Sequence, residues 1–294
     1  MKYKLIARLS FALLIARWKQ TLVAAIGVTF SITMFIGLLG FMGGLNDLLD
    51  GLILNRTPHI RLYNEIKASK QQPIDKSGRF EGFHNFISSV KPRNQRIEIY
   101  NSGAIISALK KDNRVLGIAP KVTSLVFYNI GLVDLNGVIN GIDAEAESKL
   151  FLFKDYVIAG NFIDLKNIPN SIILGKGIAE KMLVQLGDVI QVTTSKGEQF
   201  QLKVVGYFQS GISDIDNVQS YCSVNTTQKL LGESSNFITD IQIKLKDLSL
   251  APKIAREYED LFGVDAMDIQ TANAQFETGS FVRTLISYAV GITL

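Results

Sequence analysis

One long uncharged stretch dominates the hydrophobic pattern of the chain. Between Lys19 and Asp47 no residue is charged, and the core of this gap, "TLVAAIGVTFSITMFIGLLGFM", covers 22 residues from Thr21 to Met42. As a helix it would reach about 33 Å, enough for a hydrocarbon core of about 30 Å. It is too long for a cleaved signal peptide and lacks an Ala-x-Ala site. We therefore predict a retained transmembrane helix over residues 21–45.

A second apolar run closes the chain. The stretch "TLISYAVGITL" (284–294) is uncharged, and as a helix its eleven residues would rise only about 16 Å, roughly half a membrane. We expect residues 276–294 to form a helix that leads into a second span, here truncated. The sequence is accordingly interpreted as the front part of a longer membrane protein.

The residues between these runs alternate between strand and helix patterns. Strands are predicted over 59–63, 96–100, 122–129, 132–142 (with a turn at 135–137), 171–174, 189–194, 199–208 and 238–245, and helices over 103–111, 144–150 and 251–262. A hairpin turn is expected at Lys196-Gly197, and Gly263 is a helix stop. This mixture predicts an α+β fold with a large core domain over residues 46–275.

Charge gives the predicted span a direction. The formal net charge is +4, but the first twenty residues alone carry +5, so the remainder sums to −1. The five basic residues are Lys2, Lys4, Arg8, Arg17 and Lys19. Because basic residues next to a span stay cytoplasmic, residues 1–20 are predicted to be a cytoplasmic stub and 46–275 to be extracytoplasmic. No basic face is left for nucleic acid.

Two features near the span each allow two readings. Leu5–Trp18 is either an amphipathic helix on the inner membrane surface or an ordinary basic flank. Small residues at Thr33, Gly37, Gly40 and Gly44 share one helical face, which favours close packing against another membrane helix. The alternative is that glycines are simply common in such helices.

The best-formed motif is "NSIILGKGIAEKMLVQLGDVIQVTT" (170–194), a strand, a Gly-Lys pair and a helix. A phosphate loop would need glycine where Asn170 stands and a hydroxyl where Gly177 stands. The dinucleotide pattern that begins at Gly175 fails at Glu180, an acid that would repel pyrophosphate. The motif is therefore not expected to bind a nucleotide.

A structural role is predicted for this motif instead. Gly175 and Gly177 are expected to allow a tight turn from strand to helix, and Gly187 to end the helix. The residues expected to face the core are Ile178, Met182 and either Leu186 or Leu183.

No catalytic, cofactor or metal site emerges from the remaining residues. Cys222 is the only cysteine, and His59 and His84 have no metal-ligand spacing with it. The acidic stretch "SDIDN" (213–217) lacks the glycine and terminal glutamate of a calcium loop and is interpreted as a solvated loop. The hydrophobic fraction of 47% and mean hydropathy of +0.19 instead favour membrane content.

The basic stub, the predicted span, the α+β domain and the second apolar run together resemble the N-terminal half of the MacB/LolC/FtsX-type ABC permeases. The strand–helix–strand "NSIILGKGIAEKMLVQLGDVIQV" (170–192) and the following "FQLKVVGYFQSGISDID" (200–216) resemble their periplasmic core domain. "INGIDAEAE" (139–147) resembles another turn of that domain, and "RTPHIRLYN" (56–64) resembles the lipoprotein-release branch. The resemblance covers essentially the whole chain.

The resemblance implies a permease subunit without its own ATPase, located in the inner membrane. It implies a separate cytoplasmic ABC ATP-binding subunit, a second permease copy or paralogue, contact with membrane lipid, and a lipoprotein or other amphiphilic cargo. One departure is that the segment 192–200 is a tight hairpin, where the carrier-recruiting permease has a long hook. Lipoprotein release is the leading hypothesis. A MacB-like exporter of peptides or antibiotics and an FtsX-like regulator of a cell-wall hydrolase are the alternatives.

Overall fold

The computed structural model of the 294-residue chain describes residues 2–69, 72–75, 77–80, 84, 86, 88–92, 96–130 and 133–274. Residues 54–272 form one compact unit, and the N-terminal helices belong to another. The helix expected over 276–294 lies outside the described residues. The domain boundaries expected at 46 and 275 stay predictions.

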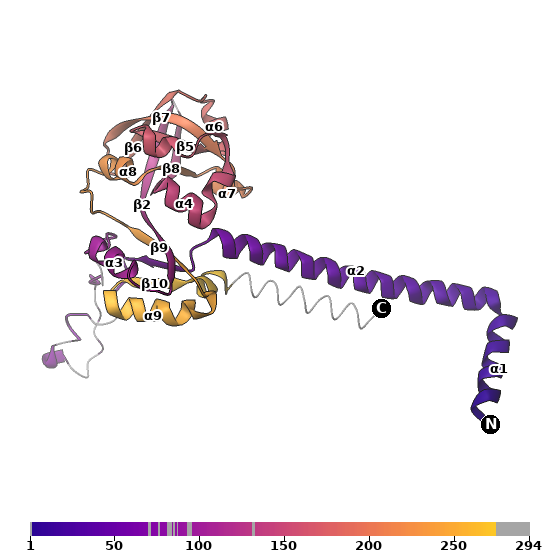
Figure 1. The fold of residues 1–294 in the computed structure, drawn as a ribbon. Coiled ribbons are helices and arrows are strands. Elements are labelled where there is room, and N and C mark those ends of the chain that lie inside the picture. The colour runs from indigo at the N-terminus through magenta and orange to yellow at the C-terminus, as the bar shows by residue number, and fades with distance from the viewer. Residues whose placement is uncertain are drawn as a thin grey trace. The chain divides into compact units, whose positions relative to one another are not determined.

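Two helices make up the N-terminal part of the chain (Figure 1). The first, α1 (Lys2–Ala16), is separated at Arg17 from α2 (Trp18–Arg56), which has 39 residues. Within α2, Trp18–Leu45 is long and apolar enough to cross a membrane by length and composition, and none of its most apolar window is buried in the protein. The predicted helix over 21–45 is thus confirmed, and α1 is helical as one of the two readings of its sequence required.

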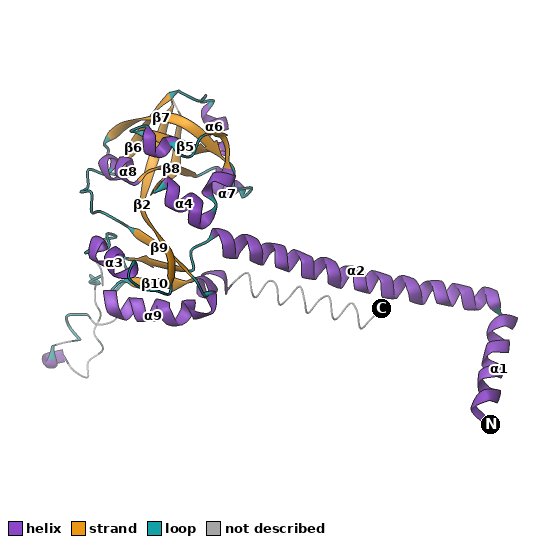
Figure 2. Cartoon of the chain, viewed as in Figure 1, coloured by secondary structure: helices purple, strands orange, loops and turns teal. Residues whose placement is uncertain are grey.

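Ten strands form a single connected sheet in the second unit (Figure 2). They are β1 (Ile60–Tyr63), β2 (Val115–Ile130), β3 (Val133–Ile142), β4 (Val157–Gly160), β5 (Ser171–Gly175), β6 (Val189–Thr194), β7 (Gln199–Phe208), β8 (Gln219–Ser223), β9 (Asp240–Leu245) and β10 (Asp265–Asp268). The helices among them are α3 (Ser102–Leu109), α4 (Ala144–Phe151), α5 (Asp164–Asn167), α6 (Lys176–Met182), α7 (Ser213–Asp216), α8 (Val224–Leu230) and α9 (Ala251–Phe262), with short 3₁₀ turns at Gly78–Phe80, Phe153–Tyr156 and Leu248–Leu250. The predicted α+β class is confirmed.

Six of these strands close into a ring, which we call the barrel lobe. Following the ladders from β2 leads to β3, β8, β5, β7 and β6, and β6 pairs again with β2 through Val126–Asn129. The pairs β3–β8 and β5–β7 are parallel, and the others are antiparallel. Closure removes the unpaired edges that an open sheet would expose.

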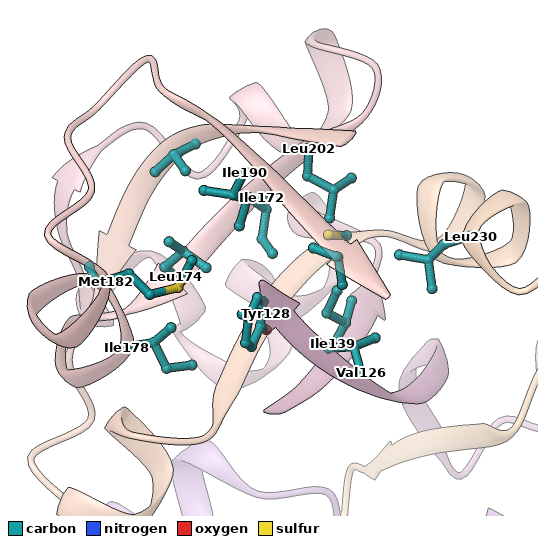
Figure 3. Packing of buried hydrophobic residues seen from close by; sticks show 14 residues of the cluster. Val126, Tyr128, Ile139, Ile172, Leu174, Ile178, Met182, Ile190, Leu202 and Leu230 are labelled. Carbon is teal, nitrogen blue, oxygen red and sulfur yellow. The ribbon is translucent and has the colours of Figure 1, made fainter. Parts of the chain in front are cut away.

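The barrel interior is filled by side chains that alternate inward along each strand (Figure 3). The residues of this core are Val126, Tyr128, Ile139, Ile172, Leu174, Ile178, Ala179, Met182, Ile190, Val192, Leu202, Val204, Cys222 and Leu230. Tyr128 is fully buried, and its hydroxyl lies 2.7 Å from Oγ of Ser220, which satisfies its polar end. The lobe is therefore a packed core rather than a channel.

The first half of β2 belongs to a smaller four-stranded layer, which we call the sheet lobe. Its strand order is β10, β1, β9 and the Val115–Lys121 half of β2, all antiparallel. Apolar side chains alternate inward, since Ile60, Leu62, Ile241 and Ile243 are all completely buried. α9 contacts β10 and β1 and buries Ile254, Ala255 and Tyr258.

Several predicted elements are reproduced, and two are wrong. β6, β7 and α9 have the predicted bounds, and Gly263 ends α9 in the left-handed conformation. Residues 96–100 do not form a strand, although the Ile99 amide donates to the Ile238 carbonyl at 2.8 Å. The turn expected within 132–142 is absent because β3 runs unbroken from Val133 to Ile142.

Candidate functional site

The small-residue face predicted in the span lies on α2. Gly37, Gly40 and Gly44 have open space where a side chain would begin. The Thr33 hydroxyl donates to the Thr29 carbonyl within the same helix at 2.8 Å, so it is satisfied without a partner helix. Gly27 and Gly43, which lie off this face, have the same open space, so the packing role of the face stays a prediction.

The glycines of the Gly-Lys motif lie against the short helix α7. A Cβ on Gly175 would come within 2.3 Å of the Asp216 carbonyl oxygen, and one on Gly177 within 2.3 Å of Oδ1 of Asn217. The backbone at Gly175 is ordinary, with a φ of −59°. These glycines are therefore needed for close approach of a neighbouring segment, which differs from the tight turn expected from the sequence. Protein atoms fill the space beside Gly175.

The helix of this motif ends earlier than predicted. α6 ends at Met182, and Leu183 follows in the left-handed conformation with its side chain 87% exposed. Ile178 and Met182 face the core as expected, but Leu186 is exposed like Leu183. Gly187, predicted to end the helix, has a φ of +96° in the connection to β6. The prediction fails because Leu183 takes the left-handed capping position that glycine usually holds.

The acidic stretch interpreted as a solvated loop is instead α7, with one buried acid. The Asp216 side chain accepts hydrogen bonds from the Ser210 amide and hydroxyl, each at 2.7 Å, and from the Gly211 amide at 3.2 Å. Asp216 thus fixes the turn that follows β7 and presents its backbone to Gly175. No sequence pattern in the stretch distinguishes this buried acid from its exposed neighbour Asp214.

The two lobes share the continuous strand β2, and α4, which packs on this strand, carries the most distinctive polar site of the unit. A Cβ on Gly117 of β2 would lie 2.4 Å from Cδ2 of Leu150, so helix and strand are in close contact. The Lys244 ammonium group of β9 donates to the Leu150 carbonyl at 2.7 Å and lies 5.4 Å from the centre of the Phe151 ring. We call these contacts, together with Glu147 of α4 and Lys121 of β2, the lobe junction.

A buried acid without a full set of partners sits in the lobe junction. Glu147 is 9% exposed, and its Oε2 atom has no hydrogen-bond partner. Burial raises the pKa of Glu147 to about 7, against an opposing attraction from Lys121. Burial likewise lowers the pKa of Lys121, so the environment disfavours the charged form of both groups.

A second acid nearby has a different environment. Asp240 forms an ion pair with Arg61, accepts a hydrogen bond from the Thr239 hydroxyl at 2.6 Å, and lies 3.4 Å from the Thr123 hydroxyl. Arg61 also stacks over the Tyr63 ring, 4.8 Å from its centre. Asp240 is therefore a satisfied carboxylate, whereas Glu147 is not. The sequence does not distinguish these two acids, because Arg61 and Thr123, which interact with Asp240, are more than 100 residues away in the chain.

A cavity of about 560 Å³ opens between α3, α5 and α8. Its lining includes Ile106, Ile142, Leu165 and Ile238, with the ammonium-bearing residues Lys166 and Lys229. Lys166 forms an ion pair with Glu145 at 2.7 Å. The lining also includes Asp143, whose carboxylate caps α4, so this acid and Lys166 are both engaged in contacts within the protein.

His59 and Cys222 have structural roles. In the part of the chain that the structure describes, no three His, Cys, Asp or Glu side chains gather in a metal-binding group. Nδ1 of His59 accepts the Leu245 amide at 3.1 Å. Cys222 is fully buried in the barrel core, where burial raises the pKa of its thiol.

These features define a class of protein: a membrane-length helix followed by a two-lobed α+β domain, without a described catalytic or metal centre. The family model for the MacB-like periplasmic core domain matches residues 21–261. The chain therefore belongs to the family that carries this domain.

Curated relatives of the chain are transmembrane proteins of lipoprotein-releasing systems. The chain is 24% identical over 245 residues to the lipoprotein-releasing system transmembrane protein LolC of Neisseria meningitidis serogroup B, covering 80% of this chain and 51% of that protein. It is 28% identical over 155 residues to LolC of Xylella fastidiosa strain 9a5c, covering 50% of this chain and 37% of that protein. The chain thus spans about half or less of the length of these relatives.

Two solved structures resemble part of the chain. The periplasmic region of MacB from Actinobacillus actinomycetemcomitans superposes with a TM-score of 0.46 at 14% identity, covering 74% of this chain and 92% of that one. The extracellular domain of the ABC-type transporter YknZ from Gram-positive bacteria superposes with a TM-score of 0.45 at 16% identity, covering 71% and 100% respectively.

Proposed function

We propose that this chain is part of the transmembrane subunit of an ABC transporter that releases lipoproteins from the inner membrane. The observation that supports the proposal most is family membership over residues 21–261, together with curated relatives that are lipoprotein-releasing transmembrane proteins. The membrane-length segment Trp18–Leu45 agrees with such a role. In this proposal the N-terminus is cytoplasmic and residues 54–272 are periplasmic.

The proposed mechanism couples ATP binding elsewhere to movement of the two-lobed domain. A separate cytoplasmic ATP-binding subunit hydrolyses ATP, and the present chain is not an enzyme. α2 is continuous to Arg56 and is followed after three residues by β1, which pairs on both sides in the sheet lobe. The His59 amide donates to the Ile243 carbonyl at 2.9 Å, which anchors the connection. A shift of α2 would therefore pull on a central strand rather than on a loop.

The proposed assembly contains a second permease subunit, either a copy or a paralogue, held in part through the small-residue face of α2. The apolar surface of α2 contacts membrane lipid. The cargo is a lipoprotein or another amphiphile.

Depletion of the protein in its source bacterium tests this proposal. The expected result is that mature outer-membrane lipoproteins are retained in the inner membrane, measured by density-gradient separation of the two membranes. Affinity purification of the full-length protein in mild detergent is expected to recover an ABC ATP-binding subunit. Normal lipoprotein sorting after depletion, or purification without an ATP-binding subunit, would contradict the proposal.

A second candidate is a MacB-like exporter of peptides or antibiotics, since the matching family model describes a MacB-like periplasmic core domain and does not specify a cargo. In that case depletion would leave lipoprotein sorting intact and increase sensitivity to exported compounds. Blocked septation with normal sorting would instead indicate a regulator of cell-wall hydrolysis.

A further inference from the structure

α4 provides a second connection between the two lobes, beside strand β2, which runs through both of them. It follows β3 of the barrel lobe after one residue, Asp143, whose carboxylate accepts the Glu145 and Ala146 amides at 3.1 Å. Its other end is held by the sheet lobe, where Leu150 packs on β2 and receives the Lys244 ammonium group. Any tilt of one lobe against the other must therefore shift α4 or break these contacts.

Glu147 on α4 carries a buried oxygen atom without a hydrogen-bond partner. Within the described residues its Oε2 atom has no partner, and the same holds for Oγ of Ser148 on the same helix and for Oε1 of Gln242 on β9. An ionised carboxylate can only accept hydrogen bonds, whereas a protonated one also carries a donor. A buried ionised carboxylate without partners is also costly. The geometry therefore favours the protonated form of Glu147 while α4 is seated.

The charged groups around Glu147 do not offset this preference. Lys121 of β2 attracts it, but no ion pair between the two forms within the described residues, and Lys121 also interacts with Asp240 and Arg61. Asp143 repels the ionised form. Two further titratable neighbours are Tyr221 of β8 and Lys244 of β9, whose ammonium group donates to the Leu150 carbonyl. The others are exposed: Glu145 and Lys149 of α4 itself, and Lys154 and Asp155 of the following 3₁₀ turn.

We propose that α4 is a proton-controlled strut between the lobes: protonated Glu147 keeps the helix seated on β2 and β9, and loss of this proton loosens it and lets the lobes tilt. The ligand of this site is the proton itself. The proposal concerns the domain alone and does not rest on the transport function proposed above.

The sign of the expected pH dependence follows from the direction of the shift. The pKa of Glu147 is raised from an ordinary 4.5 to about 7 in the seated state. The seated state therefore binds the proton more tightly than an opened state in which the side chain meets water. Its stability is highest below about pH 4.5, decreases between about 4.5 and 7, and is constant above that window.

Hydrogen–deuterium exchange of the full-length chain in detergent tests the strut. After correction for intrinsic exchange rates, protection of the α4 amides is expected to fall on the order of ten- to hundredfold between pH 5 and pH 8, given the shift from 4.5 to about 7. In Glu147→Gln, which mimics the neutral acid, protection of α4 should hardly change over this range. Glu145→Gln, the exposed acid two residues earlier, should keep the wild-type pH dependence.

Two outcomes would overturn the proposal. One is equal protection of α4 at both pH values in the wild-type chain, a measurement that requires no variant to fold. The other is a Glu147→Gln chain whose α4 protection falls with pH as much as that of the wild type. Neither outcome depends on cargo, ATP or a partner subunit, so both are independent of the lipoprotein-sorting test.

Discussion

Gly175 lies where two backbone segments touch, and this makes its substitution informative. In Gly175→Ala the new Cβ would lie 2.3 Å from the Asp216 carbonyl oxygen and 2.8 Å from that of Gln219, so backbone must move. We expect the free energy of unfolding to fall by about 1–3 kcal/mol, the usual cost of overpacking. Chemical denaturation of the full-length chain in detergent measures this.

Gly103 provides the matched control. It lies in the first turn of α3, with no atom within 4 Å of its would-be Cβ. Gly103→Ala should therefore leave stability unchanged or raise it by up to about 1 kcal/mol, because alanine favours the helix. Equal effects of the two substitutions would show that the contact with α7 is unimportant.

At the residue scale, the sequence shows which positions have a structural role more readily than it shows what that role is. Gly137 was expected to make a turn, but a Cβ there would come within 2.1 Å of the Tyr128 ring, so its role is to admit an aromatic ring from the paired strand. Such a cross-strand requirement is invisible until the register of β2 and β3 is known. The same holds for Glu147, whose burial depends on the packing of α4 against β2.

At the scale of elements, an ionic network links Arg114, directly before β2, to α9. The Arg114 guanidinium donates to Asp112 at 2.7 Å and to both carboxylate oxygens of Glu257 at 2.9 Å, and the Tyr258 hydroxyl donates to Asp112 at 2.8 Å. The Arg114 guanidinium is the main reason that the pKa of Asp112 lies well below its ordinary value, and it lowers that of Glu257. Since Arg114 is 38% exposed, solvent weakens the network.

Arg114→Met should lower the free energy of unfolding at pH 7 by about 1–2 kcal/mol. Carboxyls with lowered pKa values stabilise the fold above their unfolded pKa values of about 4 and lose this contribution as the pH falls. Between pH 5 and pH 2 the variant should therefore lose less stability than the wild type. Thermal unfolding at each pH measures this difference. Arg96→Met, at an 84% exposed side chain 3.9 Å from Glu98, serves as control.

The glycine face of α2 leads to a separate prediction about helix association. Gly37→Leu with Gly40→Leu places bulk where close packing is expected, so recovery of a second permease subunit in mild detergent should fall severalfold. Ala24→Leu adds similar bulk on the opposite side of the helix and should have little effect. Unchanged recovery in the double variant would argue that the glycines are incidental.

The elements that could be predicted from the sequence are those with a clean local pattern. β6 and β7 alternate and are joined by a Lys196-Gly197 turn, and α9 is strongly amphipathic and ends at Gly263. β8 was missed because "QSYCS" is largely polar, yet Ser220 and Cys222 are fully buried within the barrel lobe. Burial of small polar residues depends on ring closure, which no local window contains.

At the scale of the whole molecule, the direction of insertion can be tested with single cysteines. The native Cys222 is 0% exposed, and burial raises its thiol pKa, so it should react little with a membrane-impermeant thiol reagent. In intact spheroplasts, Ser77→Cys should be labelled and Ser10→Cys should not, because the basic flank is expected to remain cytoplasmic. Labelling of Ser10→Cys alone would reverse the orientation.

The pairing of β1 with β9 and β10 also dictates an order of events during synthesis. β1 leaves the ribosome soon after α2, but its partner residues, such as Ile243 opposite Ile60, follow about 180 residues later. At about 5–20 residues per second this wait lasts on the order of 10–40 seconds. The barrel lobe has all its strands before β9 is made, so it can close first. The newborn chain therefore carries an unpaired strand, β1, throughout that interval.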